Sequence, residues 1–347
     1  MTCNEFPFVS VLIPIRNEAR YIERCLQAVL AQDYPADRLE ILVIDGRSTD
    51  GTRDRVQRII DEHPAPPSIR LLDNPGGIVP TGLNIGIREA RGEIIVRVDG
   101  HTRIAPDYVR ECVIAILQSG ADNVGGRMDG HGTTFFGEVV AHVTSSPFGV
   151  GGARFHYSNR EEWVDTVYMG CWRRDHFRAA GLFDEELIRD QDDEFNYRTR
   201  AMGGKILLSP RIRSEYTVRS SPGGLWRQYF QYGYWKVRVL QKHPRQMRLR
   251  QFVPPLFVLA LAGSGVMAFI PGVRWMALIV PGGYLLANLL ASVITASRRG
   301  WRYFPLLPLV FAILHLSYGL GFLVGLIRFA RRWKDRRGRV PALEGMP

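Results

Sequence analysis

Short apolar runs alternate with one-sided helical patterns over residues 8–117. Continuous β-branched runs are typical of strands covered on both faces, and apolar positions at i, i+3, i+4 and i+7 are typical of helices with one buried side. Such alternation predicts an α/β domain with a Rossmann-like, mainly parallel central sheet and flanking helices. The expected strands are 8–13, 39–45, 69–72 and 93–98, and the expected helices are 22–30, 52–61, 80–90 and 106–117.

The alternation breaks in a glycine-rich stretch at residues 125–152. Long glycine-rich connections in compact domains are usually functional lids or disordered loops. We therefore expect a loop here, either a lid or acceptor-binding segment or an unordered connection. Beyond it the pattern predicts strands at 163–169 and 205–208 and helices at 173–180 and 192–202.

The character of the chain changes at Pro222. Residues 225–240 mix Trp and Tyr with Arg and Lys, which favours a helix at a membrane interface over an ordinary packed helix. Three apolar runs without a charged side chain follow, each about the 20 residues needed to cross a bilayer. They are 252–270, 276–294 and 305–327, and they predict C-terminal membrane helices. The expected divisions are a soluble domain at 1–221, an amphipathic basic-aromatic interface segment at 222–250, transmembrane or re-entrant helices at 251–328 and a basic tail at 329–347.

The order of these membrane helices across the bilayer stays open. Basic residues lie before the first apolar run, between the second and third, and densely after the third. The positive-inside rule puts all three groups on the cytoplasmic side, which three full crossings cannot do. Either one run is re-entrant or the rule is broken. Prolines in the first run (Pro254, Pro255) and in the third (Pro305, Pro308) make both of them candidates for the re-entrant segment.

The overall charge limits the classes of partner that we expect the protein to bind. The net charge is +11, and many of the basic residues surround the apolar runs, which indicates an anionic membrane surface and no nucleic acid. The four cysteines are scattered, so we expect neither disulfides nor a zinc site and a reducing cytosol as the compartment. Met1 to Pro7 lacks the pattern of a secretory signal, so we expect the soluble domain to stay in the cytoplasm.

Acidic residues stand at three predicted strand ends or helix starts. Asp45 ends the second strand, Asp99 and His101 follow the strand at 93–98, and Asp192 opens a helix. Each alone is compatible with an ordinary loop or helix cap. Ligands of open α/β sheets bind outside the carboxyl ends of the strands, so these groups predict one crevice with a carboxylate for proton transfer and a carboxylate–imidazole pair for a divalent cation.

Four segments carry a resemblance to a known family. V-S-V-L-I-P-I-R-N-E at 9–18, L-E-I-L-V-I-D-G-R-S-T-D-G-T at 39–52, R-G-E-I-I-V-R-V-D-G-H at 91–101 and the Asp192 segment resemble family 2 glycosyltransferases. T-G-L-N-I-G-I at 81–87 and A-D-N-V-G-G at 121–126 are most similar to the type found in succinoglycan biosynthesis. The resemblance covers about residues 8–240.

The resemblance implies a GT-A fold and an inverting sugar transfer, with the catalytic domain on the cytoplasmic face of a multi-pass protein in the inner (plasma) membrane. It implies a nucleotide-diphosphate sugar donor, most simply UDP-glucose or a related UDP-sugar, and an acceptor linked to a prenyl-phosphate type lipid or another membrane acceptor. The implied residues are Asp192 as general base, Pro14, Arg16, Glu18, Asp45, Asn84 and Asp99 for the donor, and Asp99 with His101 for the metal.

Three positions depart from the family pattern. Gly46 replaces an acid that commonly follows Asp45, His101 takes the last place of the family's D-x-D, and Gln191 replaces the glutamate beside Asp192. An imidazole ligand favours Mn²⁺ over Mg²⁺. Two alternatives stay open. The first is a processive polysaccharide synthase, although Tyr234 stands where the Q-x-x-R-W motif of those enzymes has arginine. The second is a non-catalytic relative that binds nucleotide.

Overall fold

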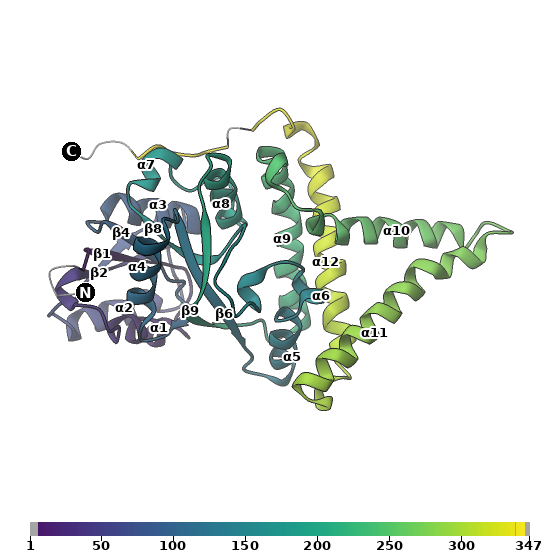
Figure 1. Ribbon diagram of the computed structural model, residues 1–347, viewed down its shortest axis with the longest axis horizontal. Coiled ribbons are helices and arrows are strands. Elements are labelled where there is room, and N and C mark those ends of the chain that lie inside the picture. Colours follow the sequence, from purple (N-terminus) through teal and green to yellow (C-terminus); the bar gives the residue numbers. More distant parts are fainter. Residues whose placement is uncertain (1–5, 337, 344–347) are drawn as a thin grey trace. The chain divides into compact units, whose positions relative to one another are not determined.

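The computed structural model describes residues 6–336 and 338–343 and divides into two compact units (Figure 1). The first unit comprises 1–129, 157–216 and 337–347, and the second comprises 130–156 and 217–336. The second unit therefore includes 130–156, which the sequence pattern placed in the soluble domain, and the first includes residues 338–343 of the basic tail.

One mixed sheet organises the first unit, in the order β3-β2-β1-β4-β8-β6-β9-β5 with β7 paired to β9. The first four strands of that order are parallel, as predicted. The predicted mainly parallel sheet is wrong beyond β4, because β8 pairs antiparallel to β4 and to β6. The strands are β1 (Val9–Ile15), β2 (Leu39–Asp45), β3 (Ser68–Asp73), β4 (Ile94–Arg97), β5 (Thr102–Ile104), β6 (Asn123–His131), β7 (Glu162–Trp163), β8 (Tyr168–Arg173) and β9 (Ile206–Thr217).

Apolar cores cover both faces of this sheet, which explains the unbroken apolar runs in the sequence. Val11 and Ile13 of β1 belong to the core that includes α1 and α4, whereas Leu12 belongs to the core that includes α3, α7 and α8. The helices of this unit are α1 (Ile22–Leu30), α2 (Thr52–Glu62), α3 (Val79–Glu89), α4 (Tyr108–Ser119), α7 (His176–Ala180) and α8 (Gln191–Ala201).

The expected glycine-rich loop at 125–152 is wrong. Most of this stretch is regular structure, namely the end of β6 followed by α5 (Phe135–Thr144) and α6 (Pro147–Val150). Its glycines permit close backbone approach: a Cβ atom added to Gly126 would lie 1.8 Å from the carbonyl oxygen of Ile212 in β9. Glycine here serves strand packing instead of loop flexibility.

Helices make up most of the second unit. Besides α5 and α6 they are α9 (Pro222–Lys242), α10 (Val253–Met267), α11 (Ile279–Arg299) and α12 (Leu307–Arg328). By length and composition, two helical segments of the described chain can cross a membrane, namely 274–299 and 307–328. In Figure 1 α9 and α12 run side by side. The contact is tight because a Cβ atom at Gly321 of α12 would lie 2.0 Å from the carbonyl oxygen of Phe230 in α9.

Candidate active site

A buried arginine links two of the predicted site acids. Arg97 is the last residue of β4, and its side chain is 4% exposed. Its Nε donates a hydrogen bond to Oδ1 of Asp99 at 2.8 Å, and its Nη1 donates to Oδ1 of Asp192. The rigid fork of a guanidinium suits such a double contact. Two carboxylates far apart in the sequence are thereby held on one cation.

Tyr168 of β8 holds the other oxygen of Asp99. Its hydroxyl donates to Oδ2 of Asp99 at 3.1 Å and lies 2.8 Å from Oγ1 of Thr102. The next residue, Met169, has a φ of +60°, a strained value for a side chain of this size, and its sulfur accepts from the backbone N–H of Asp99 at 3.4 Å. The distorted start of β8 therefore fixes Asp99 from two directions.

The two carboxylates differ in their electrostatic surroundings. Burial alone would raise the pKa of Asp99, but Arg97 and His101 outweigh it and hold that pKa below its ordinary value. Burial raises the pKa of Asp192 to about 6, against the lowering effect of Arg97. The side chain of Asp99 is 13% exposed and that of Asp192 is 28% exposed. Asp99 is therefore a fixed anion, whereas Asp192 is the more basic and more accessible group.

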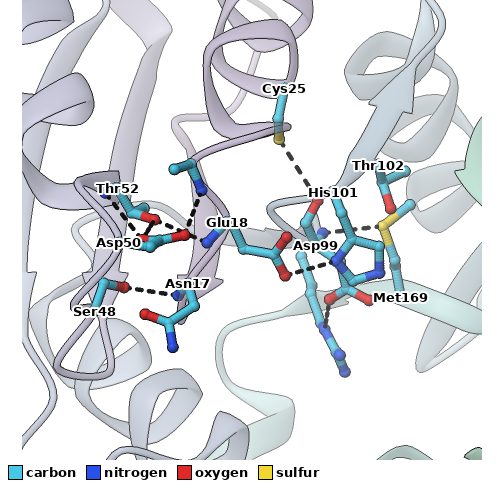
Figure 2. A network of polar contacts seen from close by, with 12 residues as sticks. Asn17, Glu18, Cys25, Ser48, Asp50, Thr52, Asp99, His101, Thr102 and Met169 are labelled. Atoms are coloured by element: carbon cyan, nitrogen blue, oxygen red, sulfur yellow. Dashed lines mark hydrogen bonds and ion pairs between the residues drawn. The ribbon is translucent and has the colours of Figure 1, made fainter. Parts of the chain in front are cut away.

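His101 pairs with Glu18, as Figure 2 shows. Nδ1 of the imidazole lies 3.0 Å from Oε1 of Glu18. Because a carboxylate only accepts, Nδ1 carries the proton, and in the neutral ring Nε2 keeps its lone pair. The ring also packs edge-on against Tyr216, with centroids 5.3 Å apart. Glu18 thus sets the tautomer that leaves Nε2 available as a ligand.

The loop that carries Glu18 is hydrogen-bonded to the loop after β2 (Figure 2). The backbone N–H of Asn17 donates to Oγ of Ser48 at 2.9 Å, and that of Glu18 donates to Oγ1 of Thr52 at 2.8 Å. In return, the N–H of Thr49 donates to Oδ1 of Asn17 at 2.8 Å. These bonds hold the ends of β1 and β2 together, so the polar residues of 39–52 position Glu18.

Asp45 lies at the end of β2, where the sequence predicted it, and is nearly fully buried. Its carboxylate accepts from the backbone N–H of Ser48 at 3.2 Å and lies 3.5 Å from Nη1 of Arg53. Its contact with the donor stays a prediction.

The remaining predicted donor residues are spread around the parallel strands. Pro14 is buried within β1 opposite Ile44, and Nη1 of Arg16 donates to the carbonyl of Gly77 at 2.8 Å. Asn84 is fully buried in α3, where its side chain exchanges hydrogen bonds with the backbone of Phe183 at 2.8 and 2.9 Å. These bonds make Asn84 a brace for the 183–185 loop. Direct donor contacts of all three stay predictions.

The acidic residues at the start of α8 have different contacts. Asp193 accepts from Oγ1 of Thr166 at 2.8 Å, and Glu194 forms a 2.8 Å ion pair with Arg198 one turn later. Of these neighbours, Asp192 is the one that bonds to Arg97. The preceding Asp190, with a φ of +61°, turns the backbone into the helix. Asp192 is thus distinguished from its neighbours by its contact with the arginine that also holds Asp99.

Comparison with known proteins gives this arrangement a family. The family described as "Glycosyl transferase family 2" matches the sequence over residues 10–178. The chain is 30% identical, over 93% of its length and 96% of the other chain, to the succinoglycan biosynthesis protein ExoA of Rhizobium meliloti. The chain belongs to glycosyl transferase family 2.

A further relative and one solved structure are similar to this chain. A dolichyl N-acetyl-alpha-D-glucosaminyl phosphate 3-beta-D-2,3-diacetamido-2,3-dideoxy-beta-D-glucuronosyltransferase of Methanococcus voltae is 27% identical over 92% of this chain and 98% of its own. The mannosyltransferase PcManGT of Pyrobaculum calidifontis, solved with GDP-Man and Mn²⁺, superposes with a TM-score of 0.61 at 22% identity, covering 93% of this chain and 88% of that one. The protein is a glycosyltransferase, and the α/β unit with its mixed sheet has the GT-A fold.

Sequence reasoning about this family 2 enzyme missed Arg97, Tyr168 and Met169. A signal for Arg97 was present, since an arginine interrupts an apolar strand two residues before Asp99. A charged residue in a strand that is buried on both faces needs a partner of opposite charge. No comparable pattern marks Tyr168, which reaches Asp99 through the pairing of β4 with β8.

Proposed function

We propose that this enzyme transfers a sugar, with inversion, from a nucleoside diphosphate sugar to a lipid-linked acceptor in polysaccharide or glycolipid synthesis. The observation that carries the proposal is the bridge through Arg97, which holds the proposed base Asp192 beside the proposed metal ligand Asp99. The acceptor class follows the relatives, one of which acts in succinoglycan biosynthesis and another on a dolichyl-linked sugar phosphate. We propose UDP-glucose or a related UDP-sugar as donor, on the family resemblance.

A divalent cation fits the residues present. Within the described residues, no three His, Cys, Asp or Glu side chains gather as a metal-binding group. We propose Asp99 and Nε2 of His101 as two protein ligands. Oxygens of the diphosphate and water are suited to the other positions. The mixed oxygen–nitrogen set favours Mn²⁺ over Mg²⁺, and PcManGT was solved with Mn²⁺. A bound cation would offset the charge that develops on the leaving diphosphate.

Asp192 has the properties of a general base. The acceptor hydroxyl oxygen bonds to the anomeric carbon on the face opposite the leaving group, and its proton moves to a carboxylate oxygen of Asp192. The bond from the anomeric carbon to the diphosphate oxygen breaks, and the electron pair leaves with the nucleoside diphosphate. A pKa of about 6 suits proton acceptance near neutral pH. A positioned base contributes about 10²–10⁴-fold in rate.

We propose that the enzyme is attached to the inner (plasma) membrane with the catalytic domain in the cytoplasm. The apolar helices of the second unit support the attachment to a membrane. Helix α11 exposes large apolar side chains, among them Leu286 at 72%. Such exposure over a whole helix is expected where lipid covers the surface. Membrane attachment would keep the active site close to a lipid-linked acceptor.

Turnover of nucleotide sugars by the purified enzyme with Mn²⁺ tests this function. Asp192→Asn should lower kcat by about 10²–10⁴-fold and leave the thermal stabilisation by the donor unchanged. Asp193→Asn is the matched control, since that carboxylate binds Thr166 instead of Arg97. Equal activity of Asp192→Asn and wild type contradicts the base assignment. Failure of every nucleotide sugar to raise the melting temperature contradicts the donor class, whereas a nucleotide sugar that raises it without being turned over favours the non-catalytic alternative.

A further inference from the structure

Residues 338–343 of the basic tail belong to the first unit, which we call the catalytic unit. The backbone N–H of Leu182 donates to the carbonyl of Pro341 at 2.9 Å, and that of Glu185 donates to the carbonyl of Arg339 at 3.0 Å. The N–H of Arg339 donates to Oδ1 of Asp184 at 2.8 Å. Leu343 packs against the apolar core around α3, α7 and α8. The chain that leaves this unit after Tyr216 therefore returns to it.

Because the chain returns to the catalytic unit, it crosses the membrane an even number of times. A tail bound to the catalytic domain lies on the same side of the bilayer as that domain, so the segment between Tyr216 and Arg339 crosses an even number of times. Three apolar runs occupy this segment, and one of them must therefore stay on the catalytic side. If the third run is the one that stays, all three basic groups lie on one face, as the positive-inside rule asks.

Helix α12 is the apolar run that stays on the catalytic side of the membrane. The 3-10 helix just before it (Trp301–Tyr303) is tied to α5, where Arg302 and Tyr303 contact Oε2 of Glu138 at 2.9 and 2.7 Å. The middle of α12 is tied to α6, where Nε2 of His315 lies 2.8 Å from the carbonyl of Phe148. Helices α5 and α6 belong to the 130–156 excursion, which begins and ends in the catalytic unit. A crossing by α12 would carry this excursion into the bilayer.

Helix α9 makes the same crossing costly. A Cβ atom at Gly233 of α9 would lie 2.0 Å from the carbonyl oxygen of Tyr318, so the two backbones touch. Helix α9 carries Lys236, Arg238 and Lys242, all buried, and Gln241 beside them donates to the carbonyl of Phe329 at 2.9 Å. A helix that carries several charged side chains is disfavoured inside the hydrocarbon of a bilayer. A helix packed on α9 along its length belongs at the interface.

We infer that α12 does not cross the membrane, and that α10 and α11 form a hairpin that enters the lipid and returns to the catalytic side. The hairpin exposes its apolar side chains, whereas half of the most apolar window of α12 is buried inside the protein. Basic residues flank the hairpin at Arg250 and Arg298, where anionic headgroups would meet them. The inference rests on the membrane attachment in the proposed function.

Cysteine labelling tests the inference that α12 stays on the catalytic side and that α10 and α11 form a hairpin in the lipid. In a Cys3→Ser background, with the other cysteines buried, single cysteines replace Arg58 in the catalytic unit, Arg299 before α12, Arg331 after α12, Ala342 in the tail and Leu286 in the hairpin. Membrane vesicles of both orientations are treated with a membrane-impermeant maleimide. Arg58→Cys, Arg299→Cys, Arg331→Cys and Ala342→Cys should react from one face, and Leu286→Cys should react only after detergent.

Each result decides a separate point. Reaction of Arg299→Cys and Arg331→Cys from opposite faces, or of Arg58→Cys and Ala342→Cys from opposite faces, overturns the inference while leaving membrane attachment intact. Free reaction of Leu286→Cys in intact vesicles overturns the hairpin. Release of wild type by alkaline carbonate overturns membrane attachment itself, and with it the inference. Retained transferase activity shows that each variant is folded, since none of these positions lies in the active site.

Discussion

Replacing Arg97 by methionine should destabilise the catalytic unit strongly. Methionine has a similar length but no charge, so Asp99 and Asp192 lose their common partner and their negative charges face each other unscreened. Removing one partner of a buried ion pair costs about 3–5 kcal/mol, and the 4% exposure of Arg97 and 13% of Asp99 put this site in that class. At about 2–4 °C per kcal/mol for a unit of this size, the melting temperature should fall by roughly 6–20 °C.

A double-mutant cycle makes this prediction specific. Adding Asp192→Asn to Arg97→Met removes one of the two unpaired carboxylates, so the double variant should be more stable than Arg97→Met alone, with a coupling energy of about 1–3 kcal/mol. Arg97→Lys should fall between wild type and Arg97→Met, because one ammonium keeps the charge but cannot fork to both acids. Thermal unfolding of the full chain in detergent compares wild type, Arg97→Met, Asp192→Asn, the double variant and Arg97→Lys. A fall below about 2 °C for Arg97→Met, or strictly additive effects, refutes the bridge.

Three further predictions concern other parts of the site and sheet. Glu18→Ala should weaken Mn²⁺ binding by about 10–100-fold, because His101 loses the acceptor that sets its tautomer. A metal-dependent thermal shift measures this affinity, with Glu23→Ala, on the exposed side of α1, as the control. Equal Mn²⁺ affinities of Glu18→Ala and Glu23→Ala count against the role of Glu18. Gly126→Ala should lower the free energy of unfolding by on the order of 3 kcal/mol, because its Cβ would meet the backbone of Ile212. Gly223→Ala is the control, since a Cβ atom there has open space and should change the melting temperature little. The turnover rate should fall as the pH drops through about 6, because a protonated Asp192 cannot accept the acceptor proton; a rate independent of pH between 7 and 5 speaks against Asp192.

Local pattern predicted the parallel half of the fold because its signals are local. The run at 39–45 is β2 residue for residue, and the stripe from Ile22 to Leu30 is α1. Periodicity of apolar residues reports burial of a strand or of one helix face, and neither depends on distant partners. The positions of Asp45, Asp99 and Asp192 at element ends follow from the same pattern.

Tertiary structure decided what depends on pairing across the chain. Glycine at 126 has the same local signal in a loop as in a strand, and only the approach of β9 distinguishes them. Arg97 becomes meaningful when β4 and α8 bring Asp99 and Asp192 to one guanidinium.

The three apolar runs show the same division. Hydropathy identified them but treated them alike, because a transfer scale measures each segment without its neighbours. Contacts of α12 with α5, α6 and α9, and of residues 339–343 with the loop at 182–185, separate the third run from the first two. The amino-acid sequence by itself thus determined which segments are strands, helices and apolar, because these are local properties. Only the tertiary structure decided which side chains meet in the candidate active site, and only its contacts led us to infer which apolar helix stays out of the bilayer, because both depend on residues far apart in the chain.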